Sequence, residues 1–241
     1  MLQKISGIVL RVVNYKDSKC VVDLFTDVIG RASFIANMSR GKKTVSRNTL
    51  WMPLSQVDFF ANMHGLSRLP QVKNATLATV YTDLPFNHIK QSVVMFLQEL
   101  LGAALRQEGP NMPLFSFVSY SFQWFDKASN PTSVANFHIV FLLRLLRFVG
   151  IEPNLDAPSL YFDMVNAEYV DKKPFHGHFL EGEHAKILPL LFRLNFSNMH
   201  LLRLEREQRR DILDGIISFY RLHIPAFSEL RSLDVLKSVF D

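Results

Sequence analysis

The sequence has only one cysteine, Cys20, among 241 residues. A single cysteine excludes an intramolecular disulfide, and it cannot supply a CxxC zinc site. Because Cys20 lies inside an apolar run, we expect it to pack in the core rather than to act as a nucleophile. The N-terminus shows no secretory signal peptide, and these features together favour a reducing cytoplasm as the compartment.

The patterns that hold nucleotides are also missing. No GxxxxGK[ST] loop occurs and no GxGxxG follows a predicted strand, so neither ATP hydrolysis nor dinucleotide binding is expected. A GxSxG nucleophile elbow is absent too. No apolar run approaches the length of a membrane span, since the best candidate, residues 138–150, contains Arg144 and Arg147. The sequence therefore predicts a soluble protein with no cofactor, no catalytic residues and no membrane partner.

Acidic residues are scarce in the first third of the chain. Residues 1–80 carry 11 Lys or Arg against four Asp and no Glu, a net charge of +7. Residues 81–241 carry 16 Lys or Arg against 18 Asp or Glu, a net charge of −2. Within a stretch that contains no acid, four cations surround a glycine: Arg40, Lys42, Lys43 and Arg47. Such a run is a solvated loop, a membrane-surface patch or a phosphate-binding loop. The charge asymmetry favours a polyanion-binding N-terminal part.

Residues 1–80 show the short apolar–polar alternation of β-strands, separated by polar turns and Gly30. The predicted strands are residues 5–13, 19–26, 31–38, 52–63 and the region from Leu66 onward. The basic run forms one long loop after the third strand. About five antiparallel strands in this length fit a small closed barrel of the OB type, although an SH3-like barrel has the same signature.

From residue 81 the apolar spacing becomes helical, with Asn87 as an N-cap and Gly109 and Gly150 as helix ends. The predicted helices are residues 89–107, 114–128, 133–150, one or two within 197–223, and 227–240. An irregular section covers residues 151–182. The predicted fold class is α+β: a five-stranded OB-type barrel over residues 1–80, followed by a helical bundle over residues 81–241.

A barrel makes phosphate binding the better interpretation of the basic loop. OB-type barrels bind single strands with cationic side chains and with aromatic rings that stack on bases. Four aromatic residues lie close to the loop in sequence: Phe34, Trp51, Phe59 and Phe60. Alternation places at least half of them in the core, and the sequence alone leaves open which of them face outward.

Two other polar clusters have simpler explanations. The segment 175–184 holds His176, His178 and His184, which could bind a metal if two of them shared one face of a strand. A polar surface turn is the favoured interpretation, and a metal-dependent hydrolase is the rival function. The arginines of residues 201–215 alternate with acids, as in the pair Glu205 and Arg209 at i,i+4, so a solvated mixed-charge face is favoured over a nucleic-acid stripe.

Several motifs resemble the RecO DNA repair and recombination-mediator family. Residues 7–31, "GIVLRVVNYKDSKCVVDLFTDVIGR", share its strand ending in Leu-Arg, its Tyr-x-acid-Ser turn and its Phe-Thr before a later glycine. Asp17 stands where the family usually has Glu. The basic loop resembles the family's Lys-Gly-x-Arg loop. "LLRFVGIEPNL" and "FYRLHIPAFSELRSLDVL", residues 145–155 and 219–236, resemble its later motifs in the same order.

The resemblance implies a DNA-binding protein that is not an enzyme. Family members bind single-stranded DNA, anneal complementary strands and help to load a recombinase during repair, in the bacterial cytoplasm and at the nucleoid. Many of them carry two CxxC pairs after the Pro-x-Leu motif, whereas this chain has Asp156 to Leu160 there, so the zinc site is expected to be absent. The expected DNA-binding residues are Arg11, Arg31, Arg40, Lys42, Lys43 and Arg47.

The partners that the resemblance implies are single- and double-stranded DNA, RecR, and the C-terminal tail of single-stranded DNA-binding protein. That tail is acidic with a terminal apolar residue, which suits an aromatic pocket rimmed by arginine, and the predicted helix 114–125 is apolar enough to line such a groove. Arg144 and Arg147 are the candidates for this rim, the alternative being that they only extend to solvent. An RNA-binding OB module is the other function that the residues leave open.

Overall fold

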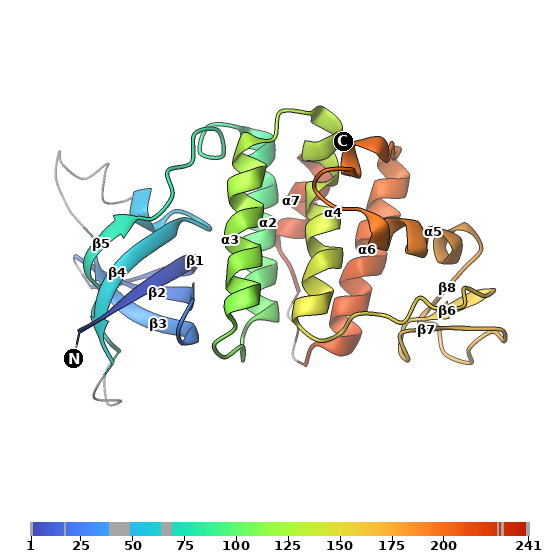
Figure 1. The fold of residues 1–241 in the computed structure, drawn as a ribbon, viewed down its shortest axis with the longest axis horizontal. Coiled ribbons are helices and arrows are strands. Elements are labelled where there is room, and N and C mark those ends of the chain that lie inside the picture. The colour runs from blue at the N-terminus through green and yellow to red at the C-terminus, as the bar shows by residue number, and fades with distance from the viewer. Residues whose placement is uncertain are drawn as a thin grey trace. The chain divides into compact units, whose positions relative to one another are not determined.

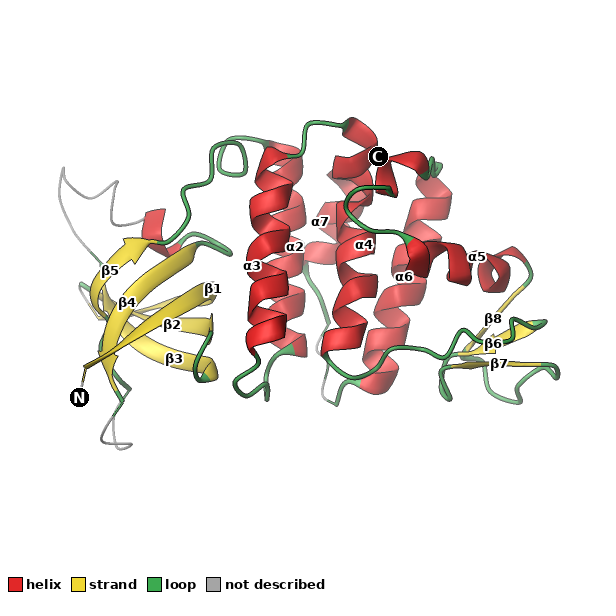
Figure 2. Ribbon diagram, in the orientation of Figure 1, coloured by secondary structure: helices red, strands yellow, loops and turns green. Residues whose placement is uncertain are grey.

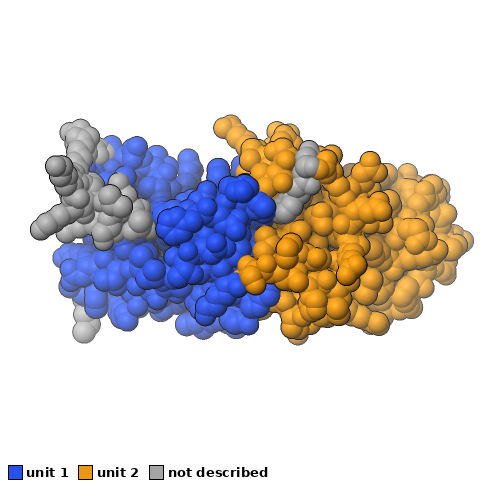
Figure 3. Space-filling view, turned by 90° about the horizontal axis from the view of Figure 1, so that it is seen from above, with its two compact units in different colours: residues 1–127 blue, residues 128–241 orange. Residues whose placement is uncertain are grey.

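The computed structural model describes residues 2–16, 18–38, 49–63, 69–225, 227 and 229–239. It contains two compact units, residues 1–127 and residues 128–241, which are coloured separately in Figure 3. Strands give way to helices near residue 80, as expected, but the first two long helices belong to the first unit together with the strands (Figure 1). No helix in the described ranges is long and apolar enough to cross a membrane.

The first unit begins with a five-stranded antiparallel sheet whose strand order is β3-β2-β1-β4-β5 (Figure 2). Its strands are β1 (Leu2–Lys16), β2 (Lys19–Thr26), β3 (Gly30–Asn37), β4 (Gln56–Asn62) and β5 (Lys73–Leu77). The sheet closes where Ile35 N donates to Pro70 O at 2.9 Å and Val72 N donates to Ile35 O at 2.9 Å. The OB-type barrel predicted from the sequence is therefore confirmed.

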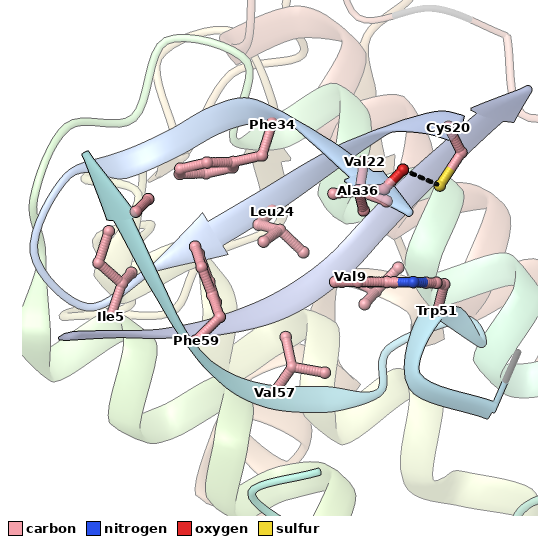
Figure 4. Packing of buried hydrophobic residues seen from close by; sticks show 11 residues of the cluster. Ile5, Val9, Cys20, Val22, Leu24, Phe34, Ala36, Trp51, Val57 and Phe59 are labelled. Atoms are coloured by element: carbon pink, nitrogen blue, oxygen red, sulfur yellow. Dashed lines mark hydrogen bonds between the residues drawn. The ribbon is translucent and has the colours of Figure 1, made fainter. Parts of the chain in front are cut away.

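Alternate side chains of these strands fill the barrel (Figure 4). The buried cluster consists of Ile5, Val9, Cys20, Val22, Leu24, Phe34, Ala36, Trp51, Val57, Phe59 and Ala61. The rings of Phe34 and Phe59 meet edge to face, with centroids 5.0 Å apart. Cys20 Sγ lies 3.8 Å from Ala36 O, and burial raises the pKa of its thiol. The prediction that Cys20 is a core residue is confirmed.

Helices α2 (His88–Ala104) and α3 (Met112–Lys127) complete the first unit. The side chain of Asn87 accepts a hydrogen bond from Lys90 N, so the predicted N-cap is correct. The predicted end at residue 107 is wrong, because α2 stops at Ala104 and turns through Leu105. That turn brings Glu108 O within 3.0 Å of Arg31 N on β3, which ties the helical pair to the barrel.

The second unit is built on α4 (Pro131–Phe148) and α6 (Arg206–His223), with α7 (Ser232–Val239) near the end of the chain. The section predicted to be irregular contains a small sheet of β6 (Tyr161–Asp163), β7 (Glu168–Val170) and β8 (Phe179–Glu181). Helix α5 (Glu183–Arg193) was missed, because Pro189 lies inside it and glycine precedes it. The predicted helical stretch from residue 197 begins instead with a 3-10 turn, η2 (Met199–Leu201).

Candidate nucleic-acid interface

Two of the six candidate DNA-binding residues, Arg11 and Arg31, lie on described strands of the barrel. Arg11 is exposed on β1, opposite Asp23 on β2, at a place where the register of the two strands shifts. A register shift increases local twist and turns a side chain away from the sheet. The structure thus leaves Arg11 accessible to a ligand, although its role in binding DNA stays a prediction.

Arg31 lies in a different environment from the one that its sequence context suggests. Its Nη1 donates to Gly102 O in α2 at 2.6 Å, and its Nη2 lies 3.6 Å from Asp23 Oδ2. Only 19% of its side chain is exposed. Asp23 also accepts a hydrogen bond of 2.5 Å from Ser33 Oγ, so Arg31 belongs to a polar network that joins β2, β3 and α2.

The basic loop itself lies outside the described residues, and with it the candidates Arg40, Lys42, Lys43 and Arg47. The residues on both sides of it are part of the barrel. Met38 N donates to Ser18 O at 2.7 Å, and Trp51, in the 3-10 turn η1 (Thr49–Trp51), is 7% exposed. The barrel therefore fixes both ends of the chain that carries these four cations.

Of the four aromatic residues close to the loop in sequence, only one faces solvent. Phe34 and Phe59 are fully buried and Trp51 nearly so, whereas Phe60 is 37% exposed. Phe60 follows Phe59 on β4, so the alternation of the strand puts one ring inside the barrel and the next outside. Phe60 is therefore the one ring of these four that a ligand could reach from outside the barrel.

A buried glutamine fixes the barrel to α3. Gln56 Nε2 donates to Ser119 O at 2.8 Å and to Tyr81 Oη at 2.9 Å. Its Oε1 accepts hydrogen bonds from Thr79 Oγ1, Ser119 Oγ and Gln123 Nε2. Burial raises the pKa of Tyr81, so this hydroxyl remains a neutral donor at physiological pH. Such a fully satisfied network specifies one arrangement of strand and helix.

A second anchor is the carboxylate of Asp126, at the end of α3. It accepts hydrogen bonds of 2.9–3.0 Å from the backbone N–H groups of residues 82, 83 and 84 and from Thr82 Oγ1. Burial alone would raise its pKa, but these hydrogen bonds together lower the pKa below its ordinary value. The buried Lys90 completes the anchor, since its Nζ lies 2.7 Å from Asp83 Oδ2 and 2.8 Å from Asp126 O.

Comparison with known proteins identifies this architecture. Residues 1–81 match the family model described as Recombination protein O N terminal, and residues 86–234 match Recombination protein O C terminal. The chain belongs to the RecO family of DNA repair proteins. DNA repair protein RecO of Phocaeicola vulgatus is 42% identical over the full length of both chains. Those of Bacteroides fragilis and Porphyromonas gingivalis are 40% and 32% identical, over 100% and 98% of both chains.

The RecO matches include residues 151–182, where a zinc site was expected to be absent, and the histidine cluster beside them. His176 Nε2 lies 3.3 Å from Asp163 Oδ1, while His184 Nε2 faces Asp211 on α6 at 3.8 Å. The described residues include no group of three or more His, Cys, Asp or Glu side chains placed to hold a metal ion. His176 and His184 therefore face two different carboxylates, and the hydrolase alternative is not favoured.

The arginines at the start of α6 are also used structurally. Glu205 caps the helix together with Gln208, and Arg209 Nη2 donates to Leu204 O at 3.1 Å. Burial, and then the charge of Arg209, lower the pKa of the neighbouring His138 to about 3, so this histidine is neutral at pH 7. Asp214 accepts two hydrogen bonds from Lys237 of α7. Arg209 is thus partly buried beside His138, and the solvated mixed-charge face stays a prediction.

The two candidate partner-binding arginines on α4 differ from each other. Arg144 is half-buried, and its Nε and Nη2 both donate to Leu194 O, at the end of α5, at 3.0 and 2.7 Å. Arg147 has a side chain that is 71% exposed, with Glu152 3.9 Å away. Leu143 and Leu146, which precede Arg144 and Arg147 in the sequence, line an apolar hollow of about 60 Å³ together with residues of α5 and α6.

The barrel brings two further cations to Phe60, namely Lys4 and Lys73, which the sequence pattern does not point to. They lie far from the basic loop in sequence, and only the strand register makes them neighbours of the ring. The anchor at Asp126 has no sequence signal either, because the backbone N–H groups that donate to its carboxylate lie more than 40 residues earlier in the chain.

Proposed function

We propose that this RecO-family chain binds single-stranded DNA, anneals complementary strands and helps to load a recombinase on strands covered by single-stranded DNA-binding protein. It does so without catalytic residues of its own. The residues assigned to DNA are Arg11, Arg31, Arg40, Lys42, Lys43 and Arg47. Within this set Arg31 acts mainly by holding β3 to α2, as its hydrogen bond to Gly102 O suggests.

One observation carries the proposal: the positive charge of the first 80 residues, +7, is concentrated on a barrel of this family. Polyanion binding is driven largely by release of counterions when cations neutralise phosphates. The same neutralisation supports annealing, because two strands approach each other more easily once their charges are compensated. The same cations can also contact the phosphates of the duplex that annealing produces.

Salt dependence tests this proposal. If about four cations neutralise phosphates, the slope of log affinity against log salt for a single strand is expected to be about −3. Affinity should then fall about fifty-fold between roughly 50 and 200 mM salt. Fluorescence titration of a labelled oligonucleotide measures both quantities. A slope near zero would mean that the basic loop does not contact phosphates and is only a solvated surface loop. Tighter binding of RNA than of DNA of the same sequence would favour the RNA-binding alternative.

Charge reversal distinguishes DNA binding by the basic loop from DNA binding by the overall positive charge of the protein. We expect Lys42→Glu with Lys43→Glu to weaken binding of all sequences alike and to slow annealing of complementary strands without added nucleotide. The matched control is Lys172→Glu with Lys173→Glu, another pair of adjacent lysines, which lies outside the barrel. Equal losses in the two double variants would show that overall charge, and not the loop, determines binding.

For the protein partners, we propose that the second unit receives the acidic tail of single-stranded DNA-binding protein, while RecR joins in loading the recombinase. The apolar hollow beside Leu143 and Leu146 is about as large as the volume of two water molecules. It suits the end of one apolar side chain. Arg147 lies one helical turn beyond Leu143 with an exposed guanidinium, where it can pair with a terminal carboxylate.

The proposed tail site predicts different effects of Arg144→Ala and Arg147→Ala on the affinity for a tail peptide. Arg147→Ala is expected to weaken binding of a tail peptide to the whole chain by about ten-fold, because a charge-assisted hydrogen bond is lost. Arg144→Ala should weaken tail binding indirectly, because it removes the two hydrogen bonds that hold Leu194 O at the end of α5. Isothermal titration calorimetry measures the affinity, with Arg221→Ala on α6 as the control for loss of one positive charge. Binding that is insensitive to Arg147→Ala would place the partner site elsewhere.

A further inference from the structure

The outer face of the barrel carries a row in which an aromatic ring lies between two cations. Lys4 on β1 is paired with Phe60 on β4, and Phe60 is paired with Lys73 on β5. Residues directly opposite each other on one face have Cβ atoms about 5 Å apart. The three side chains are therefore immediate neighbours, although they come from opposite ends of the barrel sequence.

All three side chains point away from the core. Phe59 and Ala61, which flank Phe60 on β4, are fully buried, whereas Phe60 is 37% exposed. The side chain of Lys4 is 64% exposed, and Lys73 is exposed as well. A register shift in β5 beside Asn74, whose φ is 50°, keeps Lys73 opposite the ring.

The surroundings of the ring are apolar and positively charged. Leu2, paired with Asn62 one step along the same face, is 53% exposed and lies diagonally next to Phe60. Asp58 is the acid of this face: its carboxylate is 3.3 Å from Lys4 Nζ and accepts a hydrogen bond from Ser6 Oγ. Lys73 is exposed, and no ion pair joins it to another described residue.

We propose that Lys4, Phe60 and Lys73 form a subsite for one nucleotide of single-stranded DNA, whose base stacks on the Phe60 ring while the adjoining phosphates pair with the two lysines. This inference rests on the proposed function and deepens it. Every base has a flat face that can stack on an aromatic ring, so the subsite is tolerant of sequence. Bases in a duplex are already stacked and paired, so the subsite selects unpaired strands.

The experiment compares a thymidine oligonucleotide with an abasic oligonucleotide of the same length, which keeps the phosphates and lacks the bases. Phe60→Ala is expected to weaken binding of the thymidine strand about five-fold or more. The affinity for the abasic strand and the salt slope should remain unchanged. Lys73→Gln should instead reduce the magnitude of the salt slope by about 0.7 for both strands, because one phosphate contact is lost.

Two further variants serve as controls for the role of the Phe60 ring. Phe86→Ala removes another exposed phenylalanine, which lies in the loop before α2, and should change neither affinity. Phe60→Leu keeps apolar volume without an aromatic face and should resemble Phe60→Ala, so a folding defect of the alanine variant would not hide the result. Equal weakening for thymidine and abasic strands, or none for either, would overturn the stacking subsite. Failure of the wild-type chain to bind any strand would instead refute the proposed function.

Discussion

Replacing Asp126 with alanine is expected to lower the free energy of unfolding of the first unit by about 3–5 kcal/mol. Asp126 is buried, with 6% of the residue exposed, and its carboxylate accepts hydrogen bonds from three successive backbone N–H groups. Each buried donor that loses its partner costs about 1–3 kcal/mol. Asp126→Asn keeps one acceptor oxygen and should cost about half as much.

Urea unfolding followed by tryptophan fluorescence measures this effect selectively, because both tryptophans of the chain, Trp51 and Trp124, lie in the first unit. The control is Asp156→Ala, which removes an exposed aspartate and should be nearly neutral. If Asp126→Ala were as mild as the control, the three N–H groups would have to be satisfied in some other way.

The same carboxylate predicts a dependence of stability on pH. Because the pKa of Asp126 is lowered in the folded state, its contribution is fully present above the pKa of the unfolded chain. It is lost as the pH falls through the folded pKa. The stability difference between wild type and Asp126→Asn should therefore be constant near pH 7 and shrink below about pH 4, the ordinary range of an unfolded aspartate. A difference that grew on acidification would contradict this assignment.

The elements of the fold that the sequence predicts correctly are those with a regular local pattern. The strand pattern located the first four strands, whereas the fifth, predicted only as the region from Leu66 onward, is β5 at Lys73–Leu77. Helical spacing with Asn87 as the cap located α2. Helix α5 was missed because Pro189 and a preceding glycine look locally like a loop, whereas burial of Ala185 and Leu191 stabilises it as a helix. Tertiary packing there outweighs local propensity.

The candidate site was only partly predictable for a similar reason. Charge is visible in sequence, so the concentration of cations in residues 1–80 could be seen directly. Which group each charged side chain contacts depends on residues that are far away in the sequence. Arg31 turns to Gly102 O in α2, and Lys73 reaches Phe60 through the strand register. Neither relation leaves a local signal, and both follow from closing the barrel and packing α2 against it.

Gly30→Ala is the second substitution with a large expected effect. Gly30 has a φ of 77°, a left-handed conformation that costs an alanine about 1–2 kcal/mol. A Cβ at this position would also lie 2.3 Å from Gly109 C and Gly109 O and 2.4 Å from Glu108 O. These are backbone atoms that cannot turn aside, so the turn between β2 and β3 must separate from the turn after α2. Overpacking of this kind costs roughly a further 1–3 kcal/mol.

Two other glycines allow the two causes to be separated. Gly109→Ala, on the opposite side of the same contact, meets nothing within 4 Å and should be nearly neutral. Gly150→Ala has a φ of 76° but also meets nothing within 4 Å, so it should show the conformational cost alone. Urea unfolding of the three variants, followed by circular dichroism, should therefore rank Gly30→Ala well above Gly150→Ala, with Gly109→Ala last. Equal effects at Gly30 and Gly150 would mean that the two turns are not in close contact in solution, and the hydrogen bond from Arg31 N to Glu108 O would then lose its support.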